Sequence, residues 1–418
     1  MKRLSFYLAA AMLAFACCNK DSDEPANSNS STSTTTNQNG NSQQNTNNGS
    51  DNSSDDNDEP SDNEEPSDTE DDGFVVVSPK LGTGDANPII DYMFCADPTA
   101  VEYDGRLYVY GTNDHQQYEE AEKNSYEKIK TLVMVSTDDL HSFSSDPVKL
   151  PSPYHFKANE LNFINGTYVY TFNNDWSAHD PWTWGGTKPT ACSMNYFTSK
   201  TPLDYDSWTF GANYFKNTGE YGLSWSNNHT HLHKYQGKWY LFYQSAHLQE
   251  GFGTDGGFRS IYVNEIDVDE DNVVISECIA TKKGVTAIKN LNPLSTQNAS
   301  TSAATHNIVF KETSETGHTI ATVGSPCIRV KKAEQGIIEV RNVDFTSNPD
   351  IFKCRIRGNG SIAITTGKAD NATFAEIESS SDSWQNLTAE CQESLDGVQT
   401  LYIILKGSVE VDTWSFGN

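Results

Sequence analysis

The stretch ADPTAVEYDGRLYVYGTND, residues 96–114, predicts a β-hairpin. Apolar-rich runs at 100–103 and 107–112 flank Asp104-Gly105, and an Asp-Gly pair between such runs is a strong signal for a tight turn. Asp97 precedes the first run and is followed by Pro98, so its carboxylate lies at the head of the first strand. An acid there either points into a cavity or simply starts a turn, as Asp before Pro often does.

The same turn-and-strand unit recurs twice. It reads DGRLYVYGTND at 104–114, NGTYVYTFNND at 165–175 and QGKWYLFYQSA at 236–246, so successive turn glycines are 61 and 71 residues apart. Further strand candidates follow at 131–136, 190–198 and 259–266. A repeat of this length with several strands per unit predicts propeller blades, because a β-sandwich alone would show strands every eight to twelve residues or so without it.

The C-terminal residues 295–418 predict a β-sandwich, since short strand candidates alternate there with turn signals. The candidates are Asn307–Phe310, Cys327–Val330, Gly336–Val343, Ile351–Arg357, Ser361–Thr365 and Thr400–Lys406. Residues 283–294 form a linker between the two modules.

The chain of 418 residues has a formal net charge of −28, which argues against a nucleic-acid partner because phosphates would be repelled. Residues 51–72 alone hold twelve Asp and Glu and no basic residue. Together with the Ser/Thr/Asn/Gln-rich run before them, they make 18–73 a disordered tether that cannot bury a core.

Residues 1–17 predict a signal peptide, with Lys2 and Arg3 before an apolar core too short to span a bilayer. The end of this segment resembles a bacterial lipoprotein cleavage site with Cys17 lipidated; an ordinary cleaved signal is the alternative, and Cys18 leaves the exact site open. The acidic residues 19–24 resemble the surface-export signal of Bacteroidetes lipoproteins. We therefore expect a lipid anchor in the outer membrane and exposure at the cell surface.

Several motifs resemble glycoside hydrolase family 43. Asn87-Pro88-Ile89-Ile90, Ala96-Asp97-Pro98 and the Gly-x-x-Tyr strand resemble its first blade, 151–176 its fourth, and 226–243 with 256–260 its fifth. The resemblance implies an all-β chain: a truncated five-bladed β-propeller over 74–282, with about three blades recognisable and the second and third missing after a seam near 139–146. It also implies an inverting α-L-arabinofuranosidase or β-xylosidase that acts on hemicellulose such as arabinoxylan and requires no cofactor.

The resemblance assigns roles to individual residues. Asp97 matches the general base, whereas Lys157 occupies the place of the glutamate general acid. Lysine, with an ordinary pKa near 10.4, is a poor donor to a glycosidic oxygen, and loss of a general acid typically costs about 10²- to 10⁴-fold in rate. Glu160 is no replacement, because the family phrase already has Glu there and an odd offset along a strand faces the other way. We therefore expect impaired or lost activity.

Other matched positions each have a plainer alternative. Arg259 matches a residue near the reactive sugar, or forms a surface salt bridge. His229 matches a histidine near a structural calcium or a water, or joins His231 and His233 in a polar strand face.

Residues 383–385 and 401–416 resemble carbohydrate-binding module family 6. Trp384 corresponds to an aromatic that stacks on the ligand, with a core tryptophan as the alternative. The usual partner tyrosine falls on Val340 and a ligand-binding asparagine on Glu410, so half of the sugar platform is replaced.

Three hypotheses follow from the sequence. The chain is a family 43-type hydrolase; or it is a non-catalytic surface glycan-binding lipoprotein derived from one; or it is a deletion product whose propeller does not close.

Overall fold

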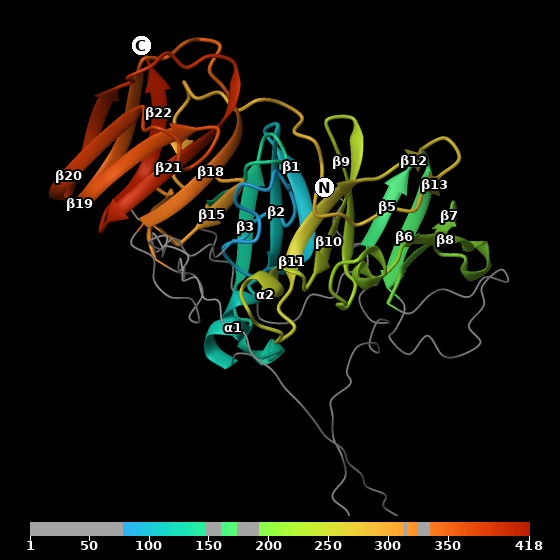
Figure 1. Cartoon of the computed structure of the whole chain (residues 1–418). Coiled ribbons are helices and arrows are strands. Elements are labelled where there is room, and N and C mark those ends of the chain that lie inside the picture. Colours follow the sequence, from blue (N-terminus) through green and yellow to red (C-terminus); the bar gives the residue numbers. More distant parts are fainter. Residues whose placement is uncertain (1–77, 122, 147–159, 174–191, 313–315, 325–334) are drawn as a thin grey trace, which may run out of the picture. The chain divides into compact units, whose positions relative to one another are not determined.

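The computed structural model describes residues 78–121, 123–146, 160–173, 192–312, 316–324 and 335–418, all within one compact unit, Gly73–Asn418. Strands dominate these residues, and the two α-helices, α1 at His115–Ala121 and α2 at Leu248–Gly251, are short (Figure 1). The predicted all-β fold, with propeller sheets followed by a β-sandwich, is confirmed. Among the described helices, none has the length and apolar character needed to cross a membrane. Cys17 and Lys157 lie outside the described residues.

The first sheet is antiparallel in the order β1-β2-β3-β4. Its strands are β1 Ala96–Tyr103, β2 Arg106–Thr112, β3 Leu132–Thr137 and β4 Ser144–Asp146. Tyr103 pairs with Arg106 across Asp104 and Gly105, whose φ angles of 51° and 75° are those of a two-residue hairpin turn. Since β4 completes this sheet, the predicted seam does not interrupt the first blade.

Two further sheets repeat the pattern. One holds β5 Glu160–Ile164, β6 Thr167–Asn173, β7 Met194–Ser199 and β8 Thr209–Phe215; the other holds β9 Thr230–Tyr235, β10 Lys238–Ser245 and β11 Ser260–Glu265. A small hairpin of β12 Val268–Asp269 and β13 Val274–Ile275 follows. Both sheets enter their central strand through a turn of the same kind, at Asn165-Gly166 and Gln236-Gly237.

The β9–β11 sheet is buried on both faces because its side chains alternate between two cores. Tyr240 and Phe242 belong to a cluster shared with Leu107 and Val109 of the first sheet. Leu241 and Tyr243 point the other way, into a cluster with the β5–β8 sheet. Burial of large apolar side chains, worth about 1.5–3 kcal/mol each, therefore joins three blades in the order β1–β4, β9–β11, β5–β8.

The C-terminal module is a sandwich whose strands follow the order β15-β18-β21-β19-β22-β17-β16, with β14 pairing β22 and β20 pairing β19. The strands are β14 Gln297–Asn298, β15 Ala304–His306, β16 Ile308–Glu312, β17 Thr319–Val323, β18 Gln335–Asp344, β19 Ile351–Thr366, β20 Ala375–Glu390, β21 Val398–Gly407 and β22 Glu410–Gly417. Its core includes Phe352, Trp414 and Phe416. Cys95, Cys278, Cys354 and Cys391 are free thiols, and Cys327 lies outside the described residues.

The strand candidates for this module were wrong in one respect and incomplete in another. Ile351–Arg357 and Ser361–Thr365 are one continuous strand, β19, in which Gly358 and Gly360 adopt φ angles of 97° and 150° and bend the chain without ending it. The candidates also omitted several strands, among them β17, β20 and β22.

Candidate functional site

Asp97 lies within β1, at a bulge between Ala96 and Thr99, and has a φ angle of 50°. A positive φ is uncommon for a residue with a side chain, and such strain is found most often at functional sites. The backbone N–H of Asp97 donates to Oε1 of Gln244 at 2.7 Å, which fixes the bulge against β10. Its side chain is only 7% exposed, so the carboxylate faces the interior of the propeller sheets.

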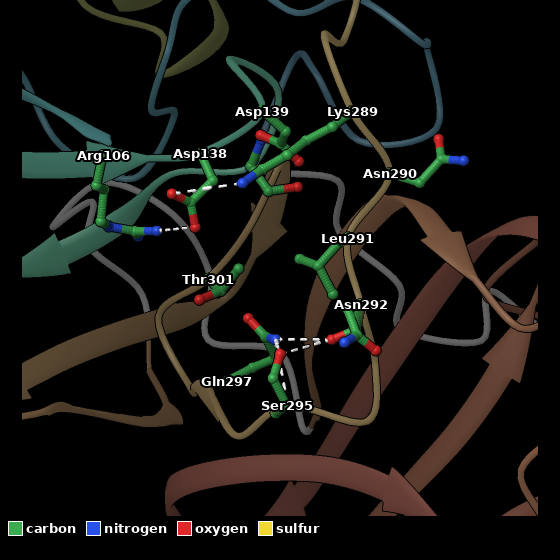
Figure 2. Close-up of a pocket in the computed structure, with 11 residues that line it drawn as sticks. Arg106, Asp138, Asp139, Lys289, Asn290, Leu291, Asn292, Ser295, Gln297 and Thr301 are labelled. Carbon is green, nitrogen blue, oxygen red and sulfur yellow. Dashed lines mark hydrogen bonds and ion pairs between the residues drawn. The ribbon is translucent and has the colours of Figure 1, made fainter. Parts of the chain in front are cut away.

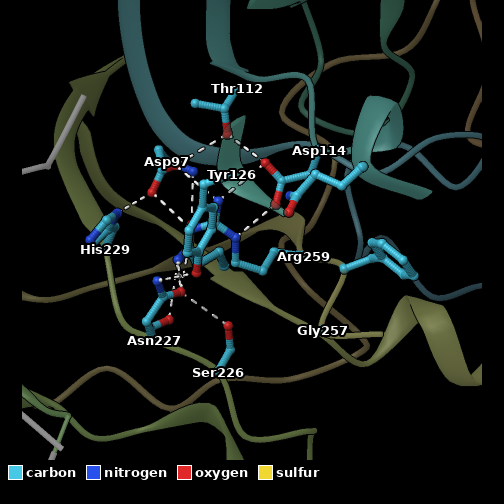
Figure 3. Close-up of polar contacts among 12 residues, drawn as sticks. Asp97, Thr112, Asp114, Tyr126, Ser226, Asn227, His229, Gly257 and Arg259 are labelled. Atoms are coloured by element: carbon cyan, nitrogen blue, oxygen red, sulfur yellow. Dashed lines mark hydrogen bonds and ion pairs between the residues drawn. The ribbon is translucent and has the colours of Figure 1, made fainter. Parts of the chain in front are cut away.

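Arg259 is the main partner of Asp97. Its Nη1 and Nη2 donate to the two carboxylate oxygens at 3.2 and 3.1 Å, while Nε and Nη2 donate to Asp114 at 2.7 and 3.1 Å (Figure 3). One guanidinium thus bridges two buried carboxylates, a geometry for which its planar fork is suited. Arg259 is 3% exposed and is therefore no surface salt bridge.

The two acids differ in how readily they bind a proton. Burial opposes ionisation of Asp97, but the charges of Arg259 and His229 outweigh it and hold the pKa of Asp97 well below its ordinary value. Burial raises the pKa of Asp114 despite the same guanidinium. The hydroxyl of Thr112 lies 2.7 Å from Asp114 and 3.1 Å from Asp97, and it can donate to only one of them. A proton that enters this pair therefore resides on Asp114, and Asp97 stays ionised.

Three histidines continue from Asp97, with His229 just before β9 and His231 and His233 in it. Nδ1 of His229 contacts Oδ1 of Asp97, and Nδ1 of His231 lies 2.7 Å from Oε1 of Glu160. The ring of His233 stacks on that of His231 at a centroid distance of 5.5 Å. Burial, followed by the charge of His231, lowers the pKa of His233 to about 4.

Calcium prefers a shell of six to eight oxygen ligands. Among the described residues no group of three or more His, Cys, Asp and Glu could hold a metal ion. Asp97 engages only Nδ1 of His229, so the calcium or water role of this residue stays a prediction.

Glu160, at the start of β5, reaches across to the neighbouring sheet. Besides His231, its Oε2 accepts the backbone N–H of Leu232 at 3.0 Å. Glu160 therefore links β5 to the neighbouring strand β9, in which His231 and Leu232 lie.

Sequence reasoning did not identify every residue around Arg259. Asn227 accepts at its Oδ1 from Gln244 at 2.7 Å and from Arg259 at 3.3 Å, and the guanidinium carbon lies 5.4 Å from the ring centroid of Tyr126. Asp114 is the last residue of the repeated unit at 104–114, and this position could have marked it as a candidate from the sequence. Asn227, Gln244 and Tyr126 carried no such signal, because Asn227 and Gln244 meet only when β9, β10 and β11 pair, and Tyr126 comes from the segment between β2 and β3.

A separate cavity of about 270 Å³ lies between the β3–β4 turn and the linker (Figure 2). Its polar groups largely bind one another: Asp138 pairs with Arg106 at 2.5 Å and Lys289 at 3.6 Å, and Gln297 donates to the carbonyl of Asn292 at 3.0 Å. No aromatic ring is among the residues that line it. Sugar rings stack on aromatic faces, so the Asp97 cluster is the stronger candidate site.

Trp384, in β20, is neither a core residue nor a free ring. It is half-buried, and the guanidinium carbons of Arg355 and Arg357 lie 4.5 and 4.6 Å from its ring centroid. Val340 is fully buried in the sandwich core, and Glu410 accepts from Nε of Arg357 at 2.7 Å. Neither therefore offers a second sugar-stacking face beside Trp384.

Comparison with known proteins agrees with this architecture. A solved glycoside hydrolase family 43 arabinoxylan arabinofuranohydrolase from Bacillus subtilis, in complex with cellotetraose, superposes with a TM-score of 0.68 at 18% identity, covering 82% of this chain and 99% of that chain. This similarity shows the shared fold. No protein-family model matches the chain.

Two curated relatives are also similar in sequence. Arabinoxylan arabinofuranohydrolases from Paenibacillus polymyxa and Bacillus subtilis (strain 168) are 23% and 24% identical over 335 and 336 residues, in each case 77% of this chain. The match covers 50% of the first relative and 63% of the second, so this chain spans about half to three fifths of their length.

Proposed function

We propose that this chain is a family 43-type glycoside hydrolase that removes arabinofuranose or xylose units from arabinoxylan, with slow turnover. The observation that carries the proposal is the strained, buried and ionised Asp97, held by Arg259 at the head of an inner strand. In this scheme Asp97 activates a water that attacks the anomeric carbon with inversion. A group on the opposite side protonates the departing oxygen.

Two features support slow turnover. A general base works best when its pKa lies near the operating pH, and the pKa of Asp97 is held well below its ordinary value. The resemblance to family 43 places Lys157 at the position of the general acid. Among the described residues, Glu160 is the carboxyl group closest in sequence to position 157. Its oxygens already contact His231 and the backbone N–H of Leu232.

Pentose release from arabinoxylan tests the proposal. The full chain should release arabinose or xylose slowly, and Asp97→Asn should abolish release while the protein stays folded. Asp138→Asn is the matched control, because Asp138 is 43% exposed and pairs with Arg106 outside the site. Pentose release that persists in Asp97→Asn would show that Asp97 is not the general base. Absence of release by the unaltered chain would refute the hydrolase proposal.

The alternative is a non-catalytic glycan-binding protein anchored at the outer-membrane surface through Cys17. The half-buried ring of Trp384, backed by two arginines, favours it because one ring face is already positioned. Retention of the chain by arabinoxylan without any pentose release would support this function over the first.

A further inference from the structure

The segment that leads into β9 alternates in burial. Trp225, Asn227 and His229 are exposed or half-buried, whereas the residues between them are buried. This alternation is typical of an extended chain, in which every second side chain lies on the same side. Trp225 therefore shares one row with Asn227 and His229. These last two residues contact Arg259 and Asp97, respectively (Figure 3).

The Trp225 ring has one packed face and a large exposed surface. A Cβ built on Gly219 would overlap three consecutive ring atoms, Cδ1, Nε1 and Cε2, at nearly equal distances, so the face of the ring lies over this glycine. Trp225 is nevertheless 53% exposed. The exposed surface therefore belongs to the opposite face and the edge of the ring, and an aromatic face presented in this way is one on which a sugar ring can stack.

Hydrogen bonds on both sides fix the backbone around Trp225. The carbonyl of Ser224 accepts from Oγ1 of Thr218 at 2.7 Å. The carbonyl of Ser226 accepts from Nδ2 of Asn217 at 2.5 Å. A ring on such a backbone loses little conformational freedom when a ligand binds, and rigid aromatic side chains are frequent anchors of binding sites.

A second aromatic ring lies at the same end of the site. Nδ2 of Asn227 donates to Oη of Tyr126 at 3.4 Å, and the guanidinium carbon of Arg259 lies 5.4 Å from the centroid of the Tyr126 ring (Figure 3). Asn227 thus connects the row that contains Trp225 to the ring that packs on Arg259. Sites for uncharged ligands combine aromatic side chains with a few polar groups, and this end of the site has that composition.

We propose that Trp225 stacks on a xylose unit of the arabinoxylan backbone, next to the pentose that is released at Asp97. The inference rests on the proposed function, because its ligand is the substrate of that site. Trp225 lies two residues before Asn227 and is outside the cluster of buried carboxylates. It therefore meets the part of the substrate beyond the scissile bond, and it determines how well the chain distinguishes a polymer from a short glycoside.

Two substrates of different length test the proposal. A p-nitrophenyl arabinofuranoside carries one sugar, whereas arabinoxylan extends beyond the scissile bond. In Trp225→Ala, the ratio of kcat/KM for arabinoxylan to kcat/KM for the aryl glycoside should fall on the order of tenfold, mainly through KM. Trp225→Phe keeps an aromatic face and should retain most of the ratio. An equal loss on both substrates, or no loss, would overturn the proposal.

Phe163→Ala is the matched control. Phe163 is also an exposed aromatic residue, at 63%, but it lies in β5 with its ring 4.8 Å from that of Tyr168. Its removal should leave the ratio of the two kcat/KM values unchanged. A fall as large as that in Trp225→Ala would show that the ratio responds to the loss of any exposed ring, and this would contradict the assignment to Trp225.

Gly219→Ala provides a test that leaves the tryptophan in the sequence. The φ angle of Gly219 is not positive, so alanine is compatible with the backbone there, and the added Cβ must displace the Trp225 ring. The ratio should fall in the same direction as in Trp225→Ala. This variant decides the matter if Trp225→Ala loses its circular dichroism, and an unchanged ratio would contradict the role of the packed ring.

A binding measurement separates this proposal from the proposed function. If the unaltered chain releases no pentose, the hydrolase is refuted, but the Trp225 site is still testable with xylohexaose in a chain that carries Trp384→Ala and so lacks the aromatic ring of the sandwich. By calorimetry that chain should bind xylohexaose, and adding Trp225→Ala should weaken binding on the order of tenfold. No binding before this second substitution, or equal binding after it, would overturn the proposal.

Discussion

Arg259 donates to both carboxylate oxygens of Asp97, at 3.2 and 3.1 Å, from a position that is 3% exposed. The same guanidinium neutralises Asp114, which has no exposed surface. The candidate base is thus held in place by a charge that also suppresses its basicity. This links the stability of the site to its chemistry.

Loss of the Arg259 charge should be costly. Arg259→Met keeps much of the side-chain volume but leaves two buried carboxylates without the guanidinium they share, and breaking a buried pair in this way costs about 3–5 kcal/mol. Urea unfolding should show this loss. Arg106→Met is the matched control, since its pair with Asp138 is partly exposed and surface pairs contribute about 0–1 kcal/mol. Equal effects of the two substitutions would contradict the buried-pair account.

Restoring an acid at position 157 should raise activity. If Lys157 stands where proton donation is needed, Lys157→Glu should increase pentose release from arabinoxylan by about 10²- to 10⁴-fold. Lys157→Gln removes the charge without providing a proton donor and should give no gain. A Glu variant no faster than the Gln variant would show that the absent acid is not what limits turnover.

The site and the fold were predictable to different depths. Asp97 was predicted because a local pattern, Asp-Pro before a hairpin, fixes its position. Gln244 and Asn227 were not, because the contacts that Asn227 makes with Gln244 and Arg259 form only when β9, β10 and β11 pair. The strand β20 was missed because its sequence, AEIESSSDSWQNLTAE, is polar and has low β-propensity. It still forms a strand because it pairs with β19 alone and needs no second apolar neighbour.

Gly360 should tolerate no side chain. A Cβ there would lie 2.0 Å from the carbonyl oxygen of Lys406, in a backbone with φ of 150°, so Gly360→Ala should destabilise the sandwich by at least about 2 kcal/mol. Gly317→Ala is the control: its φ is also positive, at 74°, but the added Cβ meets no atom within 4 Å. Its cost should be limited to backbone strain of roughly 1 kcal/mol. Denaturant midpoints that do not separate the two variants would refute the steric argument.

Trp384 should contribute to glycan binding through its ring face. Arg355 and Arg357 orient the ring by cation–π contacts, so Trp384→Ala should weaken retention on arabinoxylan on the order of tenfold, about 1.4 kcal/mol. Trp384→Phe keeps an aromatic face and should retain most of the affinity. Affinity electrophoresis measures both. Undiminished retention of the Ala variant would remove Trp384 from the binding surface.

His233 should make stability depend on pH in a defined window. Its folded pKa is about 4 and its ordinary value 6.5, so between these values the unfolded chain binds a proton that the folded chain refuses. Stability therefore rises with pH from about 4 to 6.5 and gains nothing further from His233 above that range.

His233→Gln removes this dependence. At pH 7.5 the variant and the unaltered chain should differ little, because the ring is neutral in both states. At pH 4.5 the variant should be relatively more stable by roughly 1–2 kcal/mol, a figure kept low because the half-buried ring is partly screened by solvent. Urea unfolding at the two pH values measures the change, and a difference that does not vary with pH would show that His233 is protonated as readily in the folded chain as in the unfolded one.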